Sequence, residues 1–332
     1  MYRVFRYNNL TKTSLNSSKF IRHSIVPIRT FYDSRKELSV FPALHQGFLQ
    51  QRCRSTVSGN NSQQSNLESS DEEIKLTNLS EEILSISFNR PQKANAMGRT
   101  MLSQIQDVIS ALNGDDAGSK VRCIILTSCS EKVFSAGADL QERSKMTMDE
   151  AAYFVTALRT ALDGLATLPM PIIACVEGAA LGGGLEIALT ADIIIAGSNA
   201  TFGLTETSLA IIPGAGGTVR LPRLIGAARA KEMIYTAQKI DASTAYEYGI
   251  VQHLVEAGGT EIKATEIAQA IARNGPLAVR AAKRSIQSGM DLKISEGMEI
   301  ERKNYQTIIP TSDRLEGLAA FREKRAPTFK GK

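Results

Sequence analysis

Short apolar runs alternate with segments of helical periodicity along this chain, and this alternation constrains the fold more than any other feature. The strand-like runs lie at Ile83–Phe88, 121–127, Ile172–Val176 and 193–196. Between them, residues 99–112 and 149–168 repeat apolar side chains at the spacing of an amphipathic helix. Strands that alternate with helices predict an α/β core.

The last third of the chain has a different pattern, which is nearly all helical from about residue 227. The helical segments lie at Ala242–Tyr248, 261–273, 278–288 and 294–305. Such a tail either packs against a neighbouring chain or caps its own domain. We therefore predict a core domain over residues 75–265 and a helical C-terminal region over residues 266–332.

The first 56 residues differ in composition from the rest. They contain ten Lys or Arg and two acidic residues, and they are rich in Ser. This composition predicts a mitochondrial transit peptide over residues 1–56 and a destination in the mitochondrial matrix. The alternative is a basic tail that stays attached. Residues 57–74 are rich in Ser, Asn and Gln at their start, which predicts a flexible linker.

The net charge of +5 belongs to this leader. Subtracting its charges from the totals of 39 basic and 34 acidic residues leaves 29 basic and 32 acidic residues in 57–332, a net charge of −3. The body therefore lacks the basic excess that binds nucleic-acid phosphates. No stretch offers about 20 uninterrupted apolar residues, which argues against a membrane-spanning helix.

The inventory of cysteines and histidines excludes other classes of site. Cys123, Cys129 and Cys175 remain after the leader, without metal-ligand spacing, and His253 is the one remaining histidine. A His-containing catalytic triad or a His-rich metal site is therefore not expected. His253 lies in an apolar run and is interpreted as a packed strand residue.

Two segments rich in small residues follow two of the predicted strands. Residues 134–140 centre on Gly137, a pattern that by itself is also typical of an ordinary tight turn. Residues 178–186 contain three adjacent glycines, each costing about 1 kcal/mol inside a helix relative to alanine. They favour a helix start, where free N–H groups stabilise negative charge. The spacing fits neither a dinucleotide fingerprint nor a P-loop.

A third segment places Glu206 beside the glycine-rich loop 211–218. Without the other motifs, Glu206 would be interpreted as a solvated surface acid. Together with Glu186 and the two glycine-rich segments, it completes a set of two carboxylates and two regions of backbone donors. Thioester chemistry uses this set, because donors stabilise a developing enolate oxygen and a carboxylate moves a proton.

With these motifs in order, the chain resembles the crotonase, or enoyl-CoA hydratase/isomerase, family over about residues 75–332. The resemblance rests on Glu206 and on six stretches, found at residues 89–91, 136–139, 182–186, 213–218, 313–317 and 320–325. It implies an α/β fold built as a spiral of ββα units, with a helical C-terminal trimerisation region. It also implies a homotrimer or a dimer of trimers that acts on an acyl-CoA substrate, with no metal and no redox cofactor.

The resemblance assigns roles residue by residue. Ala138 and Gly183 match the positions whose backbone N–H groups form the oxyanion hole. Glu206 matches the glutamate that exchanges a proton with the α-carbon, and Glu186 matches the glutamate that activates the attacking water. Gly214 matches a backbone position close to that water. Relatives with isomerase, decarboxylase or dehalogenase activity commonly lack one of the two glutamates, so retaining both favours hydration.

The resemblance also implies contacts with coenzyme A and the substrate. The matching positions are Ala136, Ala138, Asp139, Leu140, Gln141, Gly183, Phe321 and Lys324. Family members often carry Lys where this chain has Gln141, so Arg143 is a candidate replacement. Phe321 and Lys324 match positions that contact coenzyme A across the trimer interface, although a charged helix end explains them equally well.

Within the family, residues 204–213 and 309–318 are most similar to the mitochondrial methylglutaconyl-CoA hydratases of leucine breakdown and to related hydratase-domain proteins. The alternative is a short-chain enoyl-CoA hydratase of fatty-acid β-oxidation. A methylglutaconyl group carries a distal carboxylate and needs a cationic or hydrogen-bonding partner, which the sequence alone does not identify.

Two alternatives belong to other functional classes. One member of the subgroup binds AU-rich RNA through a lysine-studded helix, but the matching segment here, residues 94–108, has one Arg, one Asp and no Lys. The sequence therefore argues against nucleic acid as a partner. The other alternative is a catalytically inactive relative, against which both glutamates and both donor segments argue.

Overall fold

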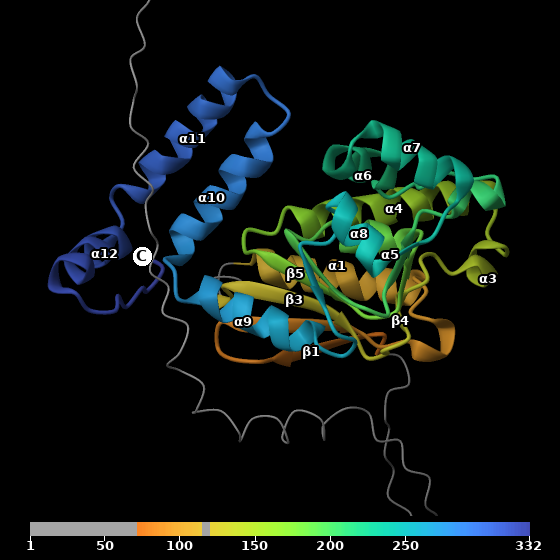
Figure 1. Cartoon of the computed structure of the whole chain (residues 1–332), viewed down its shortest axis with the longest axis horizontal. Helices are drawn as coiled ribbons and strands as arrows, with labels where there is room; N and C mark the ends of the chain where they lie inside the picture. Colours follow the sequence, from red (N-terminus) through yellow and green to blue (C-terminus); the bar gives the residue numbers. More distant parts are fainter. Residues whose placement is uncertain (1–71, 115–119) are drawn as a thin grey trace, which may run out of the picture. The chain divides into compact units, whose positions relative to one another are not determined.

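The computed structural model describes residues 72–114 and 120–332 and builds them around two β-sheets (Figure 1). The predicted transit peptide, residues 1–56, lies outside the described residues, as does most of the predicted linker. Among the described helices, none has the length and apolarity that crossing a bilayer requires.

The larger sheet contains six described strands in the order β1-β2-β3-β5-β7-β10. β1 and β2 pair antiparallel, and every later pair is parallel. The strands are β1 (Ile74–Asn78), β2 (Ile83–Phe88), β3 (Cys123–Ser128), β5 (Ile172–Val176), β7 (Ile193–Gly197) and β10 (His253–Val255). The predicted strand runs therefore become neighbours in one sheet.

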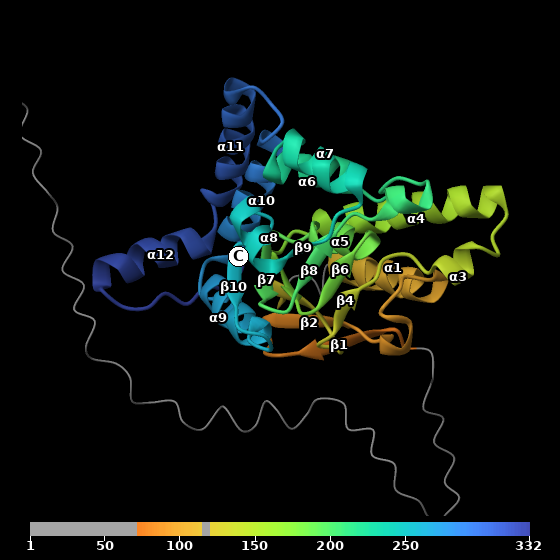
Figure 2. The ribbon, with the colours of Figure 1, turned by 45° about the vertical axis from the view of Figure 1, so that its right-hand side comes forward.

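The smaller sheet has the order β4-β6-β8-β9 and is made of short strands (Figure 2). β4, β6 and β8 are parallel, and β9 joins antiparallel to β8. The strands are β4 (Val133–Ser135), β6 (Ala179–Leu181), β8 (Thr201–Gly203) and β9 (Ile240–Asp241). The glycine-rich segments predicted from the sequence leave from the ends of β4 and β6.

Helices connect the strands and continue to the C-terminus. The longer ones are α1 (Arg99–Asn113), α4 (Met148–Ala166), α6 (Gly217–Ile225), α7 (Ala227–Thr236), α9 (Thr260–Ala272), α10 (Pro276–Gly289), α11 (Ile294–Ile308) and α12 (Ser312–Glu323). The shorter ones are η1 (Pro91–Lys93), α3 (Leu140–Arg143), α5 (Gly183–Ala188), η2 (Glu206–Leu209) and α8 (Ala242–Tyr248).

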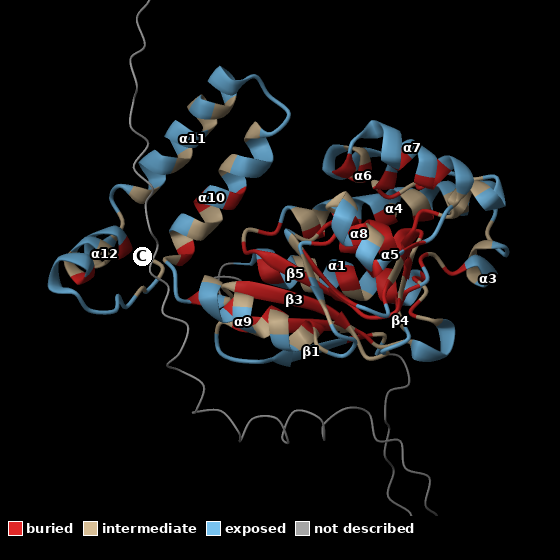
Figure 3. Cartoon of the chain, viewed as in Figure 1, coloured by how far each residue is buried: buried red, intermediate tan, exposed pale blue. Residues whose placement is uncertain are grey.

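The inner strands β2, β3, β5 and β7 of the larger sheet are buried on both faces, which explains their continuous apolar runs. Successive side chains of a strand point to opposite faces. In β3, Ile124 and Leu126 therefore join the main core, while Cys123 and Ile125 form a second cluster with the alanines of α9. Figure 3 shows the resulting burial of β3 and β5.

The main core lies between the larger sheet and the elements that carry the glycine-rich segments. Phe88 of β2 meets Phe134 of β4 edge to face, with ring centroids 5.3 Å apart. Both side chains are fully buried, and each contributes roughly 1.5–3 kcal/mol by leaving water. This contact fixes β4, and with it the turn that follows at residues 136–138.

The C-terminal region is tied to the core by a buried cation. Lys283 of α10 donates to the carbonyl of Met170 at 3.0 Å and to Oδ2 of Asp192 at 2.8 Å. α10 and α11 then pack side by side. Large apolar side chains of α10 to α12 remain exposed, among them Ile286, Met290, Ile294, Met298 and Phe321.

The structure corrects two expectations drawn from the sequence. The run at 121–127 becomes a strand only from Cys123, because the pairing of β3 with β2 begins with Cys123 opposite Ile83. The region after residue 227 is largely helical, but β9 and β10 interrupt it. The strand predicted around His253 is present as β10, whereas the two residues of β9 are too few to show a period in the sequence.

Candidate active site

The predicted catalytic residues line one cavity of about 570 Å³. Its lining includes Glu186, Glu206, Ala138, Gly183 and Gly214, together with Ala136 and Leu140 of the predicted coenzyme A contacts. These residues come from α4, α5, η2, the turn before α3 and the loop before α6. Segments up to about 80 residues apart in sequence therefore share one cavity.

Two backbone amides of the cavity lining, those of Ala138 and Gly183, lie close together. A Cβ built on Gly183 would lie 3.5 Å from the amide nitrogen of Ala138, and one built on Gly137 would lie 2.8 Å from that of Gly183. Gly137 has φ +92°, a conformation that favours glycine. Neither Ala138 nor Gly183 donates its amide to an acceptor among the described residues. Both amides are thus available to a ligand in the cavity.

The approach of α5 to β4 explains the run of adjacent glycines. A Cβ on Gly184 would lie 2.0 Å from the carbonyl oxygen of Ser135, a separation that no side chain tolerates. Ser135 is fully buried and holds its own position by donating from Oγ to the carbonyl of Asn95 at 2.8 Å. Glycine at 184 therefore sets how closely the two donor segments approach.

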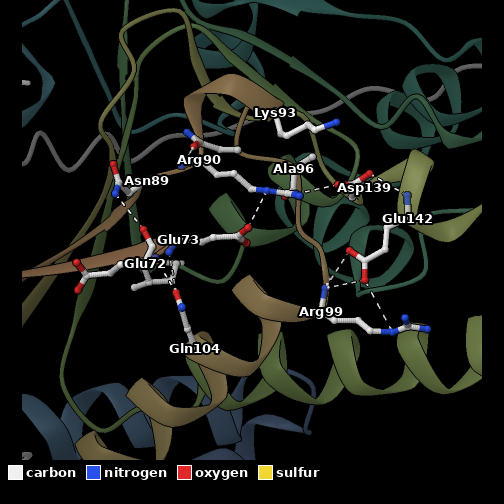
Figure 4. A network of polar contacts seen from close by, with 12 residues as sticks. Glu72, Glu73, Asn89, Arg90, Lys93, Ala96, Arg99, Gln104, Asp139 and Glu142 are labelled. Carbon is white, nitrogen blue, oxygen red and sulfur yellow. Dashed lines mark hydrogen bonds and ion pairs between the residues drawn. The ribbon is translucent and has the colours of Figure 1, made fainter. Parts of the chain in front are cut away.

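A partly buried arginine holds the turn that carries Ala138. Arg90 donates from Nη1 to Oδ2 of Asp139 at 2.9 Å and to the carbonyl of Ala96 at 2.7 Å (Figure 4). Its Nε pairs with Glu73 at 2.8 Å. Asp139 also caps α3 through the amides of Gln141 and Glu142. Burial raises the pKa of Asp139, but these bonds outweigh burial and hold it below its usual range.

Glu186 is held by backbone donors on one of its two oxygens. Oε1 accepts from the amides of Ala215 at 2.8 Å and Gly217 at 2.7 Å, and the side chain is 2% exposed. Burial raises the pKa of Glu186, and the two amides act in the opposite direction. The second oxygen is left for a ligand. The donors to Glu186 are thus Ala215 and Gly217, while Gly214 lines the cavity beside them.

Glu206 lies at the start of η2, close to the glycine-rich segment. Gly182 has φ +54°, a conformation that favours glycine, and a Cβ there would lie 3.1 Å from Oε1 of Glu206, so a side chain at 182 would also press on that carboxyl. Burial raises the pKa of Glu206 to about 7, the charge of Glu186 adds to this, and Arg143 opposes it. Oε2 of Glu206 is buried and has no hydrogen-bond partner within the described residues.

The cavity lining contains two arginines that carry no predicted catalytic role. Arg143 follows the turn, and Arg159 projects from α4. Arg159 donates from Nε to the carbonyl of Gly214 at 3.0 Å. The sequence pattern did not single out Arg159, because an arginine on an amphipathic helix is usually a solvated surface residue. The resemblance proposed Arg143 only as a replacement for a lysine.

The remaining predicted contacts lie outside the cavity lining. Asp139 is engaged by Arg90, and Gln141 accepts from Nζ of Lys93 at 2.6 Å, which places a cation where family members often carry their own lysine. Phe321 and Lys324 lie at the end of α12, with Phe321 87% exposed. Within the described residues, no cluster of three or more His, Cys, Asp or Glu side chains is arranged to hold a metal.

Comparison with known proteins now identifies the family. A model described as enoyl-CoA hydratase/isomerase matches residues 78–332. The chain belongs to the enoyl-CoA hydratase/isomerase family. It is accordingly an enzyme, and the sequence-based prediction of the crotonase family is confirmed.

Individual relatives agree with this assignment. Enoyl-CoA hydratase domain-containing protein 2, mitochondrial, of Mus musculus is 45% identical over 261 residues, covering 77% of this chain and 87% of its own. Methylglutaconyl-CoA hydratase, mitochondrial, of Homo sapiens is 42% identical over 268 residues, covering 79% and 78%. The crystal structure of an enoyl-CoA hydratase from Bacillus anthracis superposes with a TM-score of 0.76 at 46% identity, covering 78% and 100%. The predicted α/β fold of crotonase type is confirmed.

The close approach of α5 to β4 yields a direct test of the donor geometry. We expect Gly184→Ala to lower the free energy of unfolding by about 1–3 kcal/mol, because its Cβ overpacks against Ser135. Displacing the donors by about 1 Å should also lower kcat/KM on the order of 100-fold. Chemical denaturation and an enoyl-CoA hydration assay measure the two effects.

Gly297→Ala on α11 is the matched control. Its Cβ would meet ordinary contacts with Gly289 at 3.5 Å, so alanine should be tolerated there. Equal activity of Gly184→Ala and Gly297→Ala would contradict the account of the donor segments.

Proposed function

We propose that this enzyme adds water across the α,β double bond of an enoyl-CoA thioester. The observation that carries the proposal is the shared cavity, which Glu186 and Glu206 line together with Ala138 and Gly183, whose amides have no acceptor among the described residues. Isomerisation within the family needs only one group to move a proton, whereas hydration must both activate water and protonate carbon. Two carboxyls at one cavity meet that need.

The proposed steps use the protonation states that the site favours. Glu186, as a carboxylate held by two amides, takes a proton from water while the water oxygen bonds to the β-carbon. The π electrons move towards the thioester carbonyl, whose oxygen gains negative charge and accepts from the amides of Ala138 and Gly183. Glu206, as a carboxylic acid, gives its proton to the α-carbon. One proton then passes from Glu186 back to Glu206.

This scheme requires no metal and no redox cofactor, so we propose that coenzyme A enters only as part of the substrate. Among substrates, we favour 3-methylglutaconyl-CoA, which hydration converts to 3-hydroxy-3-methylglutaryl-CoA. Support comes from the human relative's name and from residues 204–213 and 309–318. A short-chain enoyl-CoA of fatty-acid β-oxidation is the second candidate, because apolar side chains such as Val155 and Leu158 also line the cavity.

We further propose a mitochondrial matrix enzyme that assembles as a homotrimer or a dimer of trimers. The basic leader and the mitochondrial names of the mouse and human relatives support the location. The large apolar side chains that α10 to α12 leave exposed support an assembly, because a neighbouring subunit could bury them. In the trimer, Phe321 and Lys324 would contact coenzyme A bound to a neighbouring subunit.

Replacing the two acids tests the proposed function. We expect Glu206→Gln and Glu186→Gln each to lower kcat for crotonyl-CoA by about 100-fold or more, because general acid–base groups contribute on the order of 10²–10⁴-fold. Binding of a saturated acyl-CoA should survive, since neither carboxyl holds the coenzyme. Loss of enoyl absorbance and calorimetric titration measure the two effects. Near-normal turnover of both variants contradicts the assigned roles.

The raised pKa of Glu206 gives a second test. Hydration needs the protonated form of Glu206, whose pKa is about 7, so kcat/KM should fall about tenfold per pH unit above that value. Arg143 lowers this pKa, so Arg143→Gln should move the alkaline limb to higher pH. Profiles of kcat/KM against pH for both proteins measure the shift. A wild-type profile that stays flat to pH 9, or a limb that moves to lower pH in the variant, contradicts the assignment.

A further inference from the structure

Arg159 of α4 lines the cavity but has no part in the proposed proton transfers. Its Nε is held by the carbonyl of Gly214 at 3.0 Å, which orients the guanidinium. Its two Nη groups have no acceptor among the described residues, so they are available to a ligand. A guanidinium in this state presents a planar fork that suits a carboxylate.

The position of Arg159 relative to the reacting atoms follows from its anchor. Gly214 immediately precedes Ala215, whose amide holds Oε1 of Glu186. Glu186 serves the water that attacks the β-carbon, so Arg159 lies on the β-carbon side of the cavity. Its positive charge also lowers the pKa of Glu186, whereas Arg143 acts on Glu206. Arg159 therefore lies towards the β-carbon end of the double bond, and Arg143 lies towards the α-carbon end.

Other groups near Arg159 do not compete for this role. Arg220 is also close to the Glu186 loop, but it is engaged by the carbonyl of Ala215 and by Asp163, and it does not line the cavity. The rest of the lining near Arg159 is apolar, as Val155, Leu158 and Ile212 show. A charged substrate group on this side would therefore find one cationic partner.

We propose that Arg159 binds a carboxylate carried beyond the β-carbon of the substrate, so that the enzyme prefers enoyl-CoA thioesters with an acidic β-substituent. A carboxymethyl group on the β-carbon fits this description. The inference rests on the proposed hydration and names the residue that selects its substrate class. Arg159 acts on binding and orientation, and it transfers no proton.

Two substrates that differ only in this carboxylate test the proposal. 3-Methylglutaconyl-CoA and 3-methylcrotonyl-CoA share the β-methyl group and the double bond, and crotonyl-CoA serves as the general substrate. We expect Arg159→Gln to lower the ratio of kcat/KM for the carboxylated over the neutral substrate by at least about tenfold, since hydrogen bonds to charged groups contribute on this scale. Most of the loss should appear in KM, and Arg159→Lys should restore part of it.

Arg143→Gln is the matched variant, because Arg143 also lines the cavity but lies at the Glu206 end. Its substrate ratio should stay at the wild-type value. A wild-type ratio in Arg159→Gln, or a selective loss in Arg143→Gln instead, overturns the assignment of Arg159. If the wild-type enzyme hydrates crotonyl-CoA but not the carboxylated substrate, the inference fails while the hydratase function stands. If it hydrates none of the three, both fail.

Discussion

The close backbone approach between the turn at Gly137 and the start of α5 is the constraint on which the site depends. It brings the amides of Ala138 and Gly183 close together at the cavity, and it leaves no room for a side chain at Gly184. The Phe88–Phe134 contact and the Arg90–Asp139 ion pair hold one partner of this approach. The packing of the core therefore determines where the two donor amides lie, because β4 leads into the turn that carries Ala138 and β6 leads into the segment that carries Gly183.

Burial raises the pKa of both catalytic-site carboxyls, but their surroundings differ. Glu186 has two amides on one oxygen, which favours its ionised form, while the buried Oε2 of Glu206 lacks any partner among the described residues. Burial and the charge of Glu186 raise the pKa of Glu206 to about 7. Different environments of this kind allow one carboxyl to act as base and the other as acid near neutral pH.

Much of this arrangement could be predicted from the sequence, and the limits have physical reasons. The apolar runs of β2, β3, β5 and β7 are visible in the sequence because both faces of these strands are buried. The strands of the smaller sheet have two or three residues and show no period. The glutamates and the donor amides followed from glycine-rich motifs that resemble a family. The partners of Arg90 and Arg159 could not be predicted, because Asp139 and Gly214 lie 49 and 55 residues away in the chain. Only folding brings these groups together.

The central claim is that a thioester oxygen accepts hydrogen bonds from the amides of Ala138 and Gly183. Isotope-edited infrared difference spectroscopy of bound butyryl-CoA, labelled with ¹³C at its carbonyl, tests this most directly, because the saturated chain cannot be hydrated. The account predicts a carbonyl stretch at lower wavenumber when bound to the enzyme than in water. A bound carbonyl that absorbs at or above its frequency in water contradicts it.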